Sequence, residues 1–179
     1  MKSKTLYSKA LFLDRDGIIN IDHGYVSKIE NFEFNEGIFD FLHIFIKKGY
    51  KLFIVTNQSG IGRNYYTQED FETLTKWMLE AFKKQNITIE SVHHCHHAPE
   101  ELCACRKPAT GMVDEILSLH NIDLKNSWMI GDKQSDIDLA HNTGIGFTIA
   151  VGERDIQNVT YHFSTIVEAK DFFEQSNLL

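Results

Sequence analysis

The sequence has few of the features that mark fibrous, secreted or membrane proteins. Only two prolines occur in 179 residues, Pro99 and Pro108, so a collagen-like repeat or a proline-rich linker is excluded. No uninterrupted apolar run approaches the roughly 20 residues that cross a bilayer. Residues 1–9 are polar and basic and lack the apolar segment of a secretion signal. We therefore expect a cytoplasmic protein with no membrane partner.

Basic residues are in the minority, with 18 Lys and Arg against 25 Asp and Glu and a formal charge of -7. Nucleic acid is excluded as a partner because binding it depends on basic side chains that displace counterions. A small anion can still bind where local amides and cations outweigh the overall negative field. The composition, 42% hydrophobic and 24% charged, is typical of a globular protein. The length predicts one domain over residues 1–179, which we expect to be a monomer.

Short apolar runs alternate along the chain with amphipathic stretches. Four runs are continuous, as in parallel strands covered on both faces: 10–13, 50–55, 127–130 and 145–150. Five stretches have apolar residues at helical spacing: 37–48, a helix beginning at Thr67, 110–120, 134–142 and 165–175. Thr-x-x-Asp at Thr67 and Thr-x-x-Glu at Thr165 predict capping boxes. The alternation predicts an α/β fold with a doubly wound, Rossmann-like parallel sheet.

Carboxylates follow the predicted strands, where open α/β sheets bind their ligands. Asp14 and Asp16 leave the first strand two residues apart. Two adjacent carboxylates stay ionised together only with a cation between them, which indicates a hard divalent ion such as Mg2+. Asp132 follows another strand and can add a third oxygen ligand, with Asp136, four residues later, as a supporting acid. Alone, each acid is equally typical of a turn or a helix N-terminus.

Two further residues suit a phosphate group. Thr56 ends a buried run, so its hydroxyl and the amides that follow can contact phosphate oxygens. Lys107 can offset phosphoryl charge. Taken alone, Thr56 is typical of a helix cap or turn residue, and Lys107 is typical of a solvated surface lysine. Their order along the chain, together with the carboxylates, favours a phosphate site.

The three cysteines lie close together, within eleven residues and beside four of the nine histidines. The pattern Cys95-x-His97, five residues, then Cys103-x-Cys105 supplies one nitrogen and three thiolates, the donor set of a structural zinc site. His93, His94 and His96 also lie within reach. The alternative is a loop of reduced cysteines with incidental histidines. We expect a zinc-binding loop over about 93–108.

In order, these motifs resemble the four motifs of the haloacid dehalogenase superfamily of phosphohydrolases. They are Leu13-Asp14-Arg15-Asp16-Gly17, Thr56-Asn57-Gln58-Ser59, Lys107 and Gly131-Asp132. The stretches 22–25, 31–34, 56–63 and 105–108 look more particularly like the heptose 1,7-bisphosphate 7-phosphatases, with histidinol-phosphate phosphatases a close second. The resemblance covers nearly the whole chain. It implies a sheet of the haloacid dehalogenase type without a large cap domain.

The resemblance also implies a role for each matched residue. Asp14 would be the nucleophile that forms an aspartyl phosphate, and Asp16 the general acid and then the general base. Asp14, the backbone carbonyl of Asp16 and Asp132 would hold Mg2+. Thr56 and Lys107 would stabilise the transferring phosphoryl group.

Substrate recognition would fall to a larger set, Asp22, His23, Gly24, Tyr25, Asn57, Gln58, Ser59 and Arg106. The family pattern Cys-Pro-His selects His97 as the zinc ligand and leaves His96 as a minor alternative. The short loop that follows is closer to histidinol-phosphate phosphatases. The implied reaction is Mg2+-dependent removal of the C7 phosphate from a small heptose bisphosphate in nucleotide-activated heptose biosynthesis. The alternatives are a histidinol-phosphate phosphatase and a non-catalytic, zinc-stabilised module that binds a phosphorylated ligand; a paired nucleophile and acid argue against the second.

Overall fold

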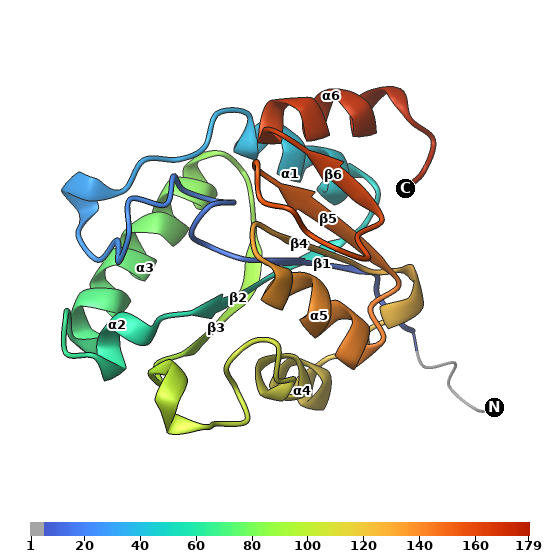
Figure 1. Ribbon diagram of the computed structural model, residues 1–179. Helices are drawn as coiled ribbons and strands as arrows, with labels where there is room; N and C mark the ends of the chain where they lie inside the picture. Colours follow the sequence, from blue (N-terminus) through green and yellow to red (C-terminus); the bar gives the residue numbers. More distant parts are fainter. Residues whose placement is uncertain (1–5) are drawn as a thin grey trace.

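The computed structural model describes residues 6–179, which form a six-stranded sheet between two layers of helices (Figure 1). Residues 1–5, the start of the stretch predicted to lack a secretion signal, lie outside the described residues. The strands are β1 (Ala10–Leu13), β2 (Lys51–Asn57), β3 (Ile89–Cys95), β4 (Trp128–Gly131), β5 (Phe147–Val151) and β6 (Tyr161–Phe163). Their order is β3-β2-β1-β4-β5-β6, and every neighbouring pair is parallel. The predicted doubly wound α/β fold is confirmed.

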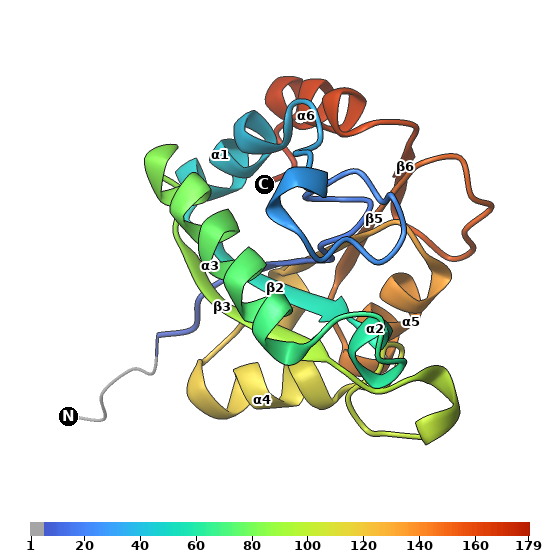
Figure 2. The ribbon, with the colours of Figure 1, turned by 90° about the vertical axis from the view of Figure 1, so that its left-hand side faces the viewer.

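Helices cover both faces of the sheet. They are α1 (Ile38–Lys47), α2 (Ser59–Gly62), α3 (Gln68–Lys84), α4 (Gly111–Leu119), α5 (Gln134–Thr143) and α6 (Ile166–Gln175), with short 3-10 turns at Ile29–Asn31, Pro99–Glu101 and Leu124–Asn126. Figure 2 shows α1, α3 and α6 on one side of the sheet and α4 and α5 on the other. None of the helices in residues 6–179 combines the length and hydropathy that a membrane span requires.

The side chains of β1 divide between two apolar cores. Leu11 and Leu13 pack in the core under α1, α3 and α6. Ala10 and Phe12 pack in the core under α4 and α5. All four are fully buried, because successive side chains of a strand point to opposite faces and both faces are covered. This explains why the strand has no polar alternation in its sequence.

The central strands were predicted, but the edge strands β3 and β6 were not. β3 reads Ile-Glu-Ser-Val-His-His-Cys and is mostly half-buried, and β6 is three residues long. Neither is a continuous apolar run, because an edge strand has a neighbour on one side only. The sequence pattern used for the central strands therefore does not detect them.

The capping box predicted at Thr67 is confirmed. The Asp70 amide donates to Thr67 Oγ1 at 3.1 Å, and the Thr67 amide donates to Asp70 Oδ2 at 2.8 Å. At Thr165 only half of the box forms. The Glu168 amide donates to Thr165 Oγ1, but the Glu168 carboxylate accepts from the Ser164 amide instead, at 2.9 Å. The carboxylate thus reaches one residue further back than the motif predicts.

The order of the strands in the sheet brings Asp14 and Asp132 together. β1 lies between β2 and β4, so the connections leave it in opposite directions and create a crevice at the carboxyl ends of the central strands. Asp14 directly follows β1, and Asp132 directly follows β4. Residues 118 positions apart in the sequence therefore meet at the point where such sheets bind ligands.

Candidate active site

Three buried carboxylates form the centre of the site. Oxygen atoms of Asp14, Asp132 and Asp136 all lie within 4.8 Å of one another. The chain can turn beneath them because Gly17 has a φ of +92°, in the left-handed region. A Cβ at Gly17 would lie 2.6 Å from Asp132 Cγ, so the absence of a side chain also makes room for this carboxylate. The sequence analysis expected Asp14 and Asp132 in this group and Asp136 as a supporting acid.

Lys107 is the buried counter-charge of this cluster. Its Nζ lies 2.9 Å from Asp14 Oδ1 and 2.6 Å from Asp136 Oδ1. The same ammonium donates to the carbonyl oxygen of Val55, at 2.8 Å. Burial lowers the pKa of Lys107, but the charges of Asp136 and Asp14 outweigh burial and hold this pKa above its ordinary value. Lys107 is therefore a fixed cation beside the predicted nucleophile.

The acidic cluster fits a divalent cation. Burial raises the pKa of Asp14 to about 6, although Lys107 opposes the shift. Burial and the charge of Asp14 also raise the pKa of Asp132. Asp132 Oδ1 is buried and accepts no hydrogen bond within the described residues. A hard cation would neutralise this excess of negative charge and use that oxygen, and carboxylate oxygens are the ligands that Mg2+ prefers.

Arg154 contacts the same carboxylate. Its guanidinium forms an ion pair with Asp132 Oδ2, and its Nη1 donates to the carbonyl oxygen of Asp132 at 3.0 Å. Arg154 lies in the loop after β5, and its side chain is 55% exposed. The orphaned Oδ1 of Asp132 is thus the oxygen left for a metal ion.

Asp16 is not part of this carboxylate cluster and is held by its own neighbours. Arg15 donates to both carboxylate oxygens, at 3.1 and 2.9 Å. Asn20 Nδ2 donates to Oδ1 at 3.0 Å, and Gln58 Nε2 donates to Oδ2 at 2.9 Å. Burial raises the pKa of Asp16, but Arg15 and these hydrogen bonds prevail and hold it below its usual value. In this arrangement Asp16 is ionised, and its hydrogen bonds fix the orientation of the carboxylate.

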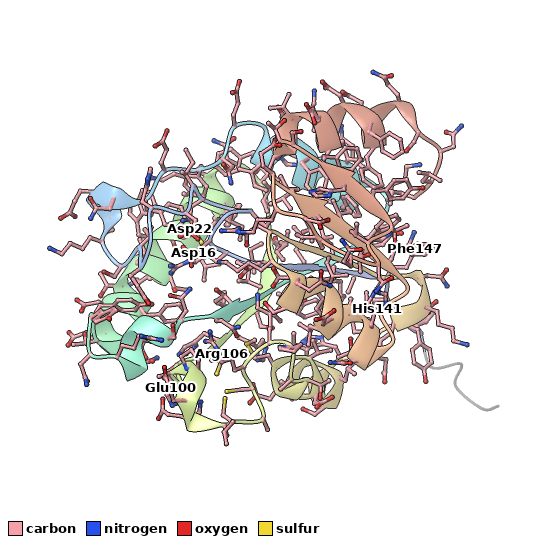
Figure 3. All side chains as sticks on the ribbon, viewed as in Figure 1. Asp16, Asp22, Glu100, Arg106, His141 and Phe147 are labelled. Atoms are coloured by element: carbon pink, nitrogen blue, oxygen red, sulfur yellow. The ribbon has the colours of Figure 1, made fainter. Side chains whose placement is uncertain are left out.

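Most residues predicted to bind substrate line one cavity of about 350 Å³ beside this centre. Its wall is formed by Asp16, Asp22, Gly24, Tyr25, Asn57, Gln58, Ser59, Tyr66, Arg106, Lys107, Lys133 and Ser135. Figure 3 shows Asp16 and Asp22 near each other, with Arg106 below them and Phe147 away from all three, on the right of the view. His23 is not in this wall and pairs instead with Glu33 at 3.6 Å.

A second, larger hollow of about 710 Å³ lies on the other side of Asp132. Its wall contains four acids, Asp22, Glu33, Glu36 and Asp132, against a single cation, Arg154. The smaller cavity has three cations, Arg106, Lys107 and Lys133, against two acids, Asp16 and Asp22. An anionic ligand is therefore favoured electrostatically in the smaller cavity, despite its size.

The predicted zinc ligands come together in the structure. Atoms of Cys95, His97, Cys103 and Cys105 form the second metal-type cluster among residues 6–179, and His96 is not part of it. Four donor pairs are 3.3 to 3.6 Å apart, and the Sγ atoms of Cys95 and Cys105 are 2.7 Å apart, so none of the cysteines is disulfide-bonded. Ligands of a tetrahedral zinc ion are separated by roughly 3.5–3.8 Å. The donor set fits zinc after a small separation of one thiol pair.

The cysteine cluster is connected to the catalytic centre through three hydrogen bonds. The Arg106 amide donates to Cys103 Sγ at 3.4 Å, a bond typical of the surroundings of metal-binding thiolates. The Lys107 amide donates to Asn57 Oδ1 at 2.9 Å, and Asn57 Nδ2 donates to the Lys107 carbonyl at 3.2 Å. Asn57, predicted to bind substrate, thus fixes the backbone of the lysine. The loop places Arg106 and Lys107 between the cysteines and the carboxylates.

Four residues of the site have no role in the sequence interpretation: Arg15, Tyr66, Lys133 and Arg154. Lys133 lies next to Asp132 in the sequence, and its Nζ is 3.4 Å from Asp22 Oδ2 and 3.7 Å from Asp132 Oδ1. The sequence signal for Lys133 is its position directly after an aspartate at the end of a strand. Tyr66 and Arg154 carry no such signal, because loops bring them to the site from segments without a recognisable pattern.

The chain is similar to known proteins over almost its full length. Residues 104–154 match a family model described as HAD-hydrolase-like. A protein of Helicobacter pylori named D-glycero-beta-D-manno-heptose-1,7-bisphosphate 7-phosphatase is 46% identical over 96% of this chain and 98% of its own. A protein of Campylobacter jejuni named as the enzyme for the alpha anomer is 45% identical over 96% of this chain and 99% of its own.

Solved structures agree on the fold. The D,D-heptose 1,7-bisphosphate phosphatase of B. bronchiseptica, crystallised with magnesium and phosphate, superposes with a TM-score of 0.81 at 22% identity. The match covers 93% of this chain and 98% of that one. At this identity the similarity establishes the common fold.

Proposed function

Because the chain belongs to the heptose-1,7-bisphosphate 7-phosphatase family of HAD-like hydrolases, we propose that this phosphatase removes the C7 phosphate of a D-glycero-D-manno-heptose 1,7-bisphosphate. The observation that carries the proposal is the pairing of Asp14 with the buried Lys107, at 2.9 Å, beside a cavity lined by Arg106 and Lys133. Although the protein is acidic overall, the wall of this cavity contains Arg106, Lys107 and Lys133, and these cations favour binding of a phosphorylated ligand.

We assign the chemical steps to two carboxylates. An oxygen of Asp14 attacks phosphorus, and the bond between phosphorus and the sugar oxygen breaks as the aspartyl phosphate forms. Asp16, which must take up a proton when the substrate binds, gives that proton to the departing oxygen, which leaves as the sugar hydroxyl. Water then attacks the aspartyl phosphate and gives its proton to Asp16, which releases inorganic phosphate and restores both side chains. Lys107 and the hydroxyl of Thr56 stabilise charge on the transferring group.

Asp14, Asp132 and the backbone carbonyl of Asp16 are the proposed ligands of Mg2+, which supplies additional charge neutralisation at the phosphoryl oxygens when it is bound. Zinc is proposed to be held by Cys95, His97, Cys103 and Cys105 and to have a structural role, since four protein ligands leave no open position. Its contribution to catalysis is the placement of the loop that carries Arg106 and Lys107.

Substrate orientation follows from the shape of the site. A primary phosphate on the extended C7 arm reaches the buried Asp14, whereas the phosphate on the ring stays near the rim. Arg106 and Lys133 line that rim and are proposed to bind the remote phosphate. Binding energy from the remote group then positions the reacting one. We propose that the 1-phosphate is retained in the product.

The test is a parallel measurement of kcat/KM on both anomers of heptose 1,7-bisphosphate and on histidinol phosphate, with Mg2+ present. The named relatives differ in the anomer that they act on, so both are needed. Phosphorus NMR of the product identifies the phosphate that remains. We expect a heptose 1-phosphate product and a higher kcat/KM for one heptose anomer than for histidinol phosphate. A preference for histidinol phosphate would overturn the substrate proposal.

A further inference from the structure

Tyr66 lies at the end of a buried hydrogen-bond chain that leads to Asp16. Its hydroxyl is 2.5 Å from Gln58 Oε1. Gln58 Nε2 in turn is 2.9 Å from Asp16 Oδ2 and 2.9 Å from Thr56 Oγ1. One amide therefore connects a tyrosine to the proposed general acid and to the proposed phosphate-binding threonine.

The direction of each hydrogen bond in this chain is fixed by chemistry. The Asp16 carboxylate, which also accepts from Arg15, has no proton to donate to Gln58 when ionised. Gln58 must therefore turn its NH2 group toward Asp16 and its carbonyl oxygen toward Tyr66. The Tyr66 hydroxyl is then the donor. A reversed amide would place two acceptors, Gln58 Oε1 and Asp16 Oδ2, against each other.

The surroundings keep Tyr66 in this role. Tyr66 is 8% exposed and Gln58 is 3% exposed, so water does not easily replace either partner. Burial raises the pKa of Tyr66 to about 12, which keeps the hydroxyl protonated. The ring packs directly on Gly60, where any Cβ would overlap it. Thr67, the next residue, is the N-cap of α3 and anchors the backbone at this point.

We propose that Tyr66 is a positioning residue: by orienting the Gln58 amide, it holds the Asp16 carboxylate in the direction from which it protonates the leaving oxygen. The inference rests on the proposed role of Asp16. Tyr66 acts through Gln58, and Gln58 has both amide protons engaged within the protein. Without the tyrosine hydroxyl, the buried Gln58 Oε1 loses this donor, and the amide is held through its NH2 group alone.

The experiment compares Tyr66→Phe with wild type on two esters, the heptose 1,7-bisphosphate and p-nitrophenyl phosphate. The value of kcat/KM reports steps only up to departure of the leaving group. A sugar alkoxide leaves with a proton from Asp16, whereas p-nitrophenolate leaves without one. We expect kcat/KM to fall about fivefold on the sugar phosphate, the size of effect typical of one lost hydrogen bond. It should change less than about twofold on the aryl ester.

The matched control is Tyr50→Phe, which removes a buried tyrosine hydroxyl at the opposite end of the sheet, where it accepts from Trp128 Nε1 at 3.3 Å. It should lower kcat/KM on neither ester. Equal losses on both esters in Tyr66→Phe, or no loss on either, would overturn the role of Tyr66. Failure of the wild-type protein to hydrolyse either ester would instead overturn the proposed phosphatase mechanism.

Discussion

Lys107 Nζ lies 2.6 Å from Asp136 Oδ1, and both side chains are 1% exposed. This ion pair connects the predicted zinc-binding loop, which carries Lys107, to helix α5. The helix begins three residues after the end of β4. A buried ion pair of this kind contributes little net stability compared with apolar packing, but removing one partner leaves an uncompensated charge. Asp136 thus determines whether Lys107 stays in place beside Asp14.

Asp136→Ala is expected to destabilise the fold and reduce turnover together. The free energy of unfolding should fall by about 3–5 kcal/mol, the cost of breaking a buried pair. Chemical denaturation and kcat measure the two effects. Asp138→Ala is the matched control on the same helix, since within residues 6–179 the Asp138 side chain accepts only from the Gln134 side chain, at 2.9 Å, and should cost under about 1 kcal/mol. Equal effects of the two variants would contradict the special role of Asp136.

Asp14→Asn should abolish turnover without unfolding the protein. The amide cannot form the aspartyl phosphate, so kcat is expected to drop at least roughly a thousandfold. Since burial raises the pKa of Asp14 to about 6, its charge opposes folding at neutral pH in the absence of metal. The variant should therefore melt no lower than wild type in EDTA at pH 7. The relative stability of the wild type should fall as the pH rises from about 4 to 7. Activity within tenfold of wild type would reject Asp14 as the nucleophile.

Arg106→Ala is expected to reduce kcat/KM more for the heptose bisphosphate than for p-nitrophenyl phosphate, because only the first substrate has a remote phosphate to bind. Losing a charged hydrogen-bond donor should cost roughly tenfold or more. Arg63→Ala is a suitable comparison: Arg63 pairs with Glu100 at 3.4 Å and is not in the wall of the cavity. An equal loss on both substrates in Arg106→Ala would remove the assignment of the remote phosphate to Arg106.

Gly17→Ala should weaken Mg2+ binding. Gly17 and Gly49 both have positive φ, at +92° and +80°, so alanine is strained at each. Only at Gly17 does the new Cβ meet a neighbour, Asp132 Cγ at 2.6 Å. Isothermal titration with Mg2+ should show weaker binding for Gly17→Ala than for Gly49→Ala, which tests the backbone strain without the contact to Asp132. Unchanged Mg2+ affinity in Gly17→Ala would argue against Asp132 as a ligand.

Elemental analysis of protein purified without chelators should give about one zinc per chain. Cys105→Ser should reduce the zinc content and lower kcat, because the loop carrying Lys107 loses its anchor. His96→Ala is the matched control and should retain full zinc content, since His96 lies outside the cluster of donor atoms. Loss of zinc in His96→Ala but not in His97→Ala would reverse the choice of histidine.

Much of the fold could be predicted from local patterns. The apolar run Ala10–Leu13 coincides with β1, and Thr67 caps α3 through the predicted reciprocal bonds. Such features depend on residues close together in the sequence, and burial on both faces leaves a continuous apolar signal. The edge strand β3 has no such signal, since its exposed side tolerates Glu90 and two histidines.

The sequence by itself determined which chemical groups the protein has: strand-end carboxylates, a lysine beside the cysteines, and a four-ligand metal motif. Their spacing was informative because each motif is short. Only the tertiary structure decided their partners. It paired Lys107 with Asp136, placed Arg154 on Asp132, and brought Tyr66 through Gln58 to Asp16. These partners come from different strand ends and loops, and the geometry of a buried contact between them depends on how the whole sheet twists and packs. No local pattern records that geometry.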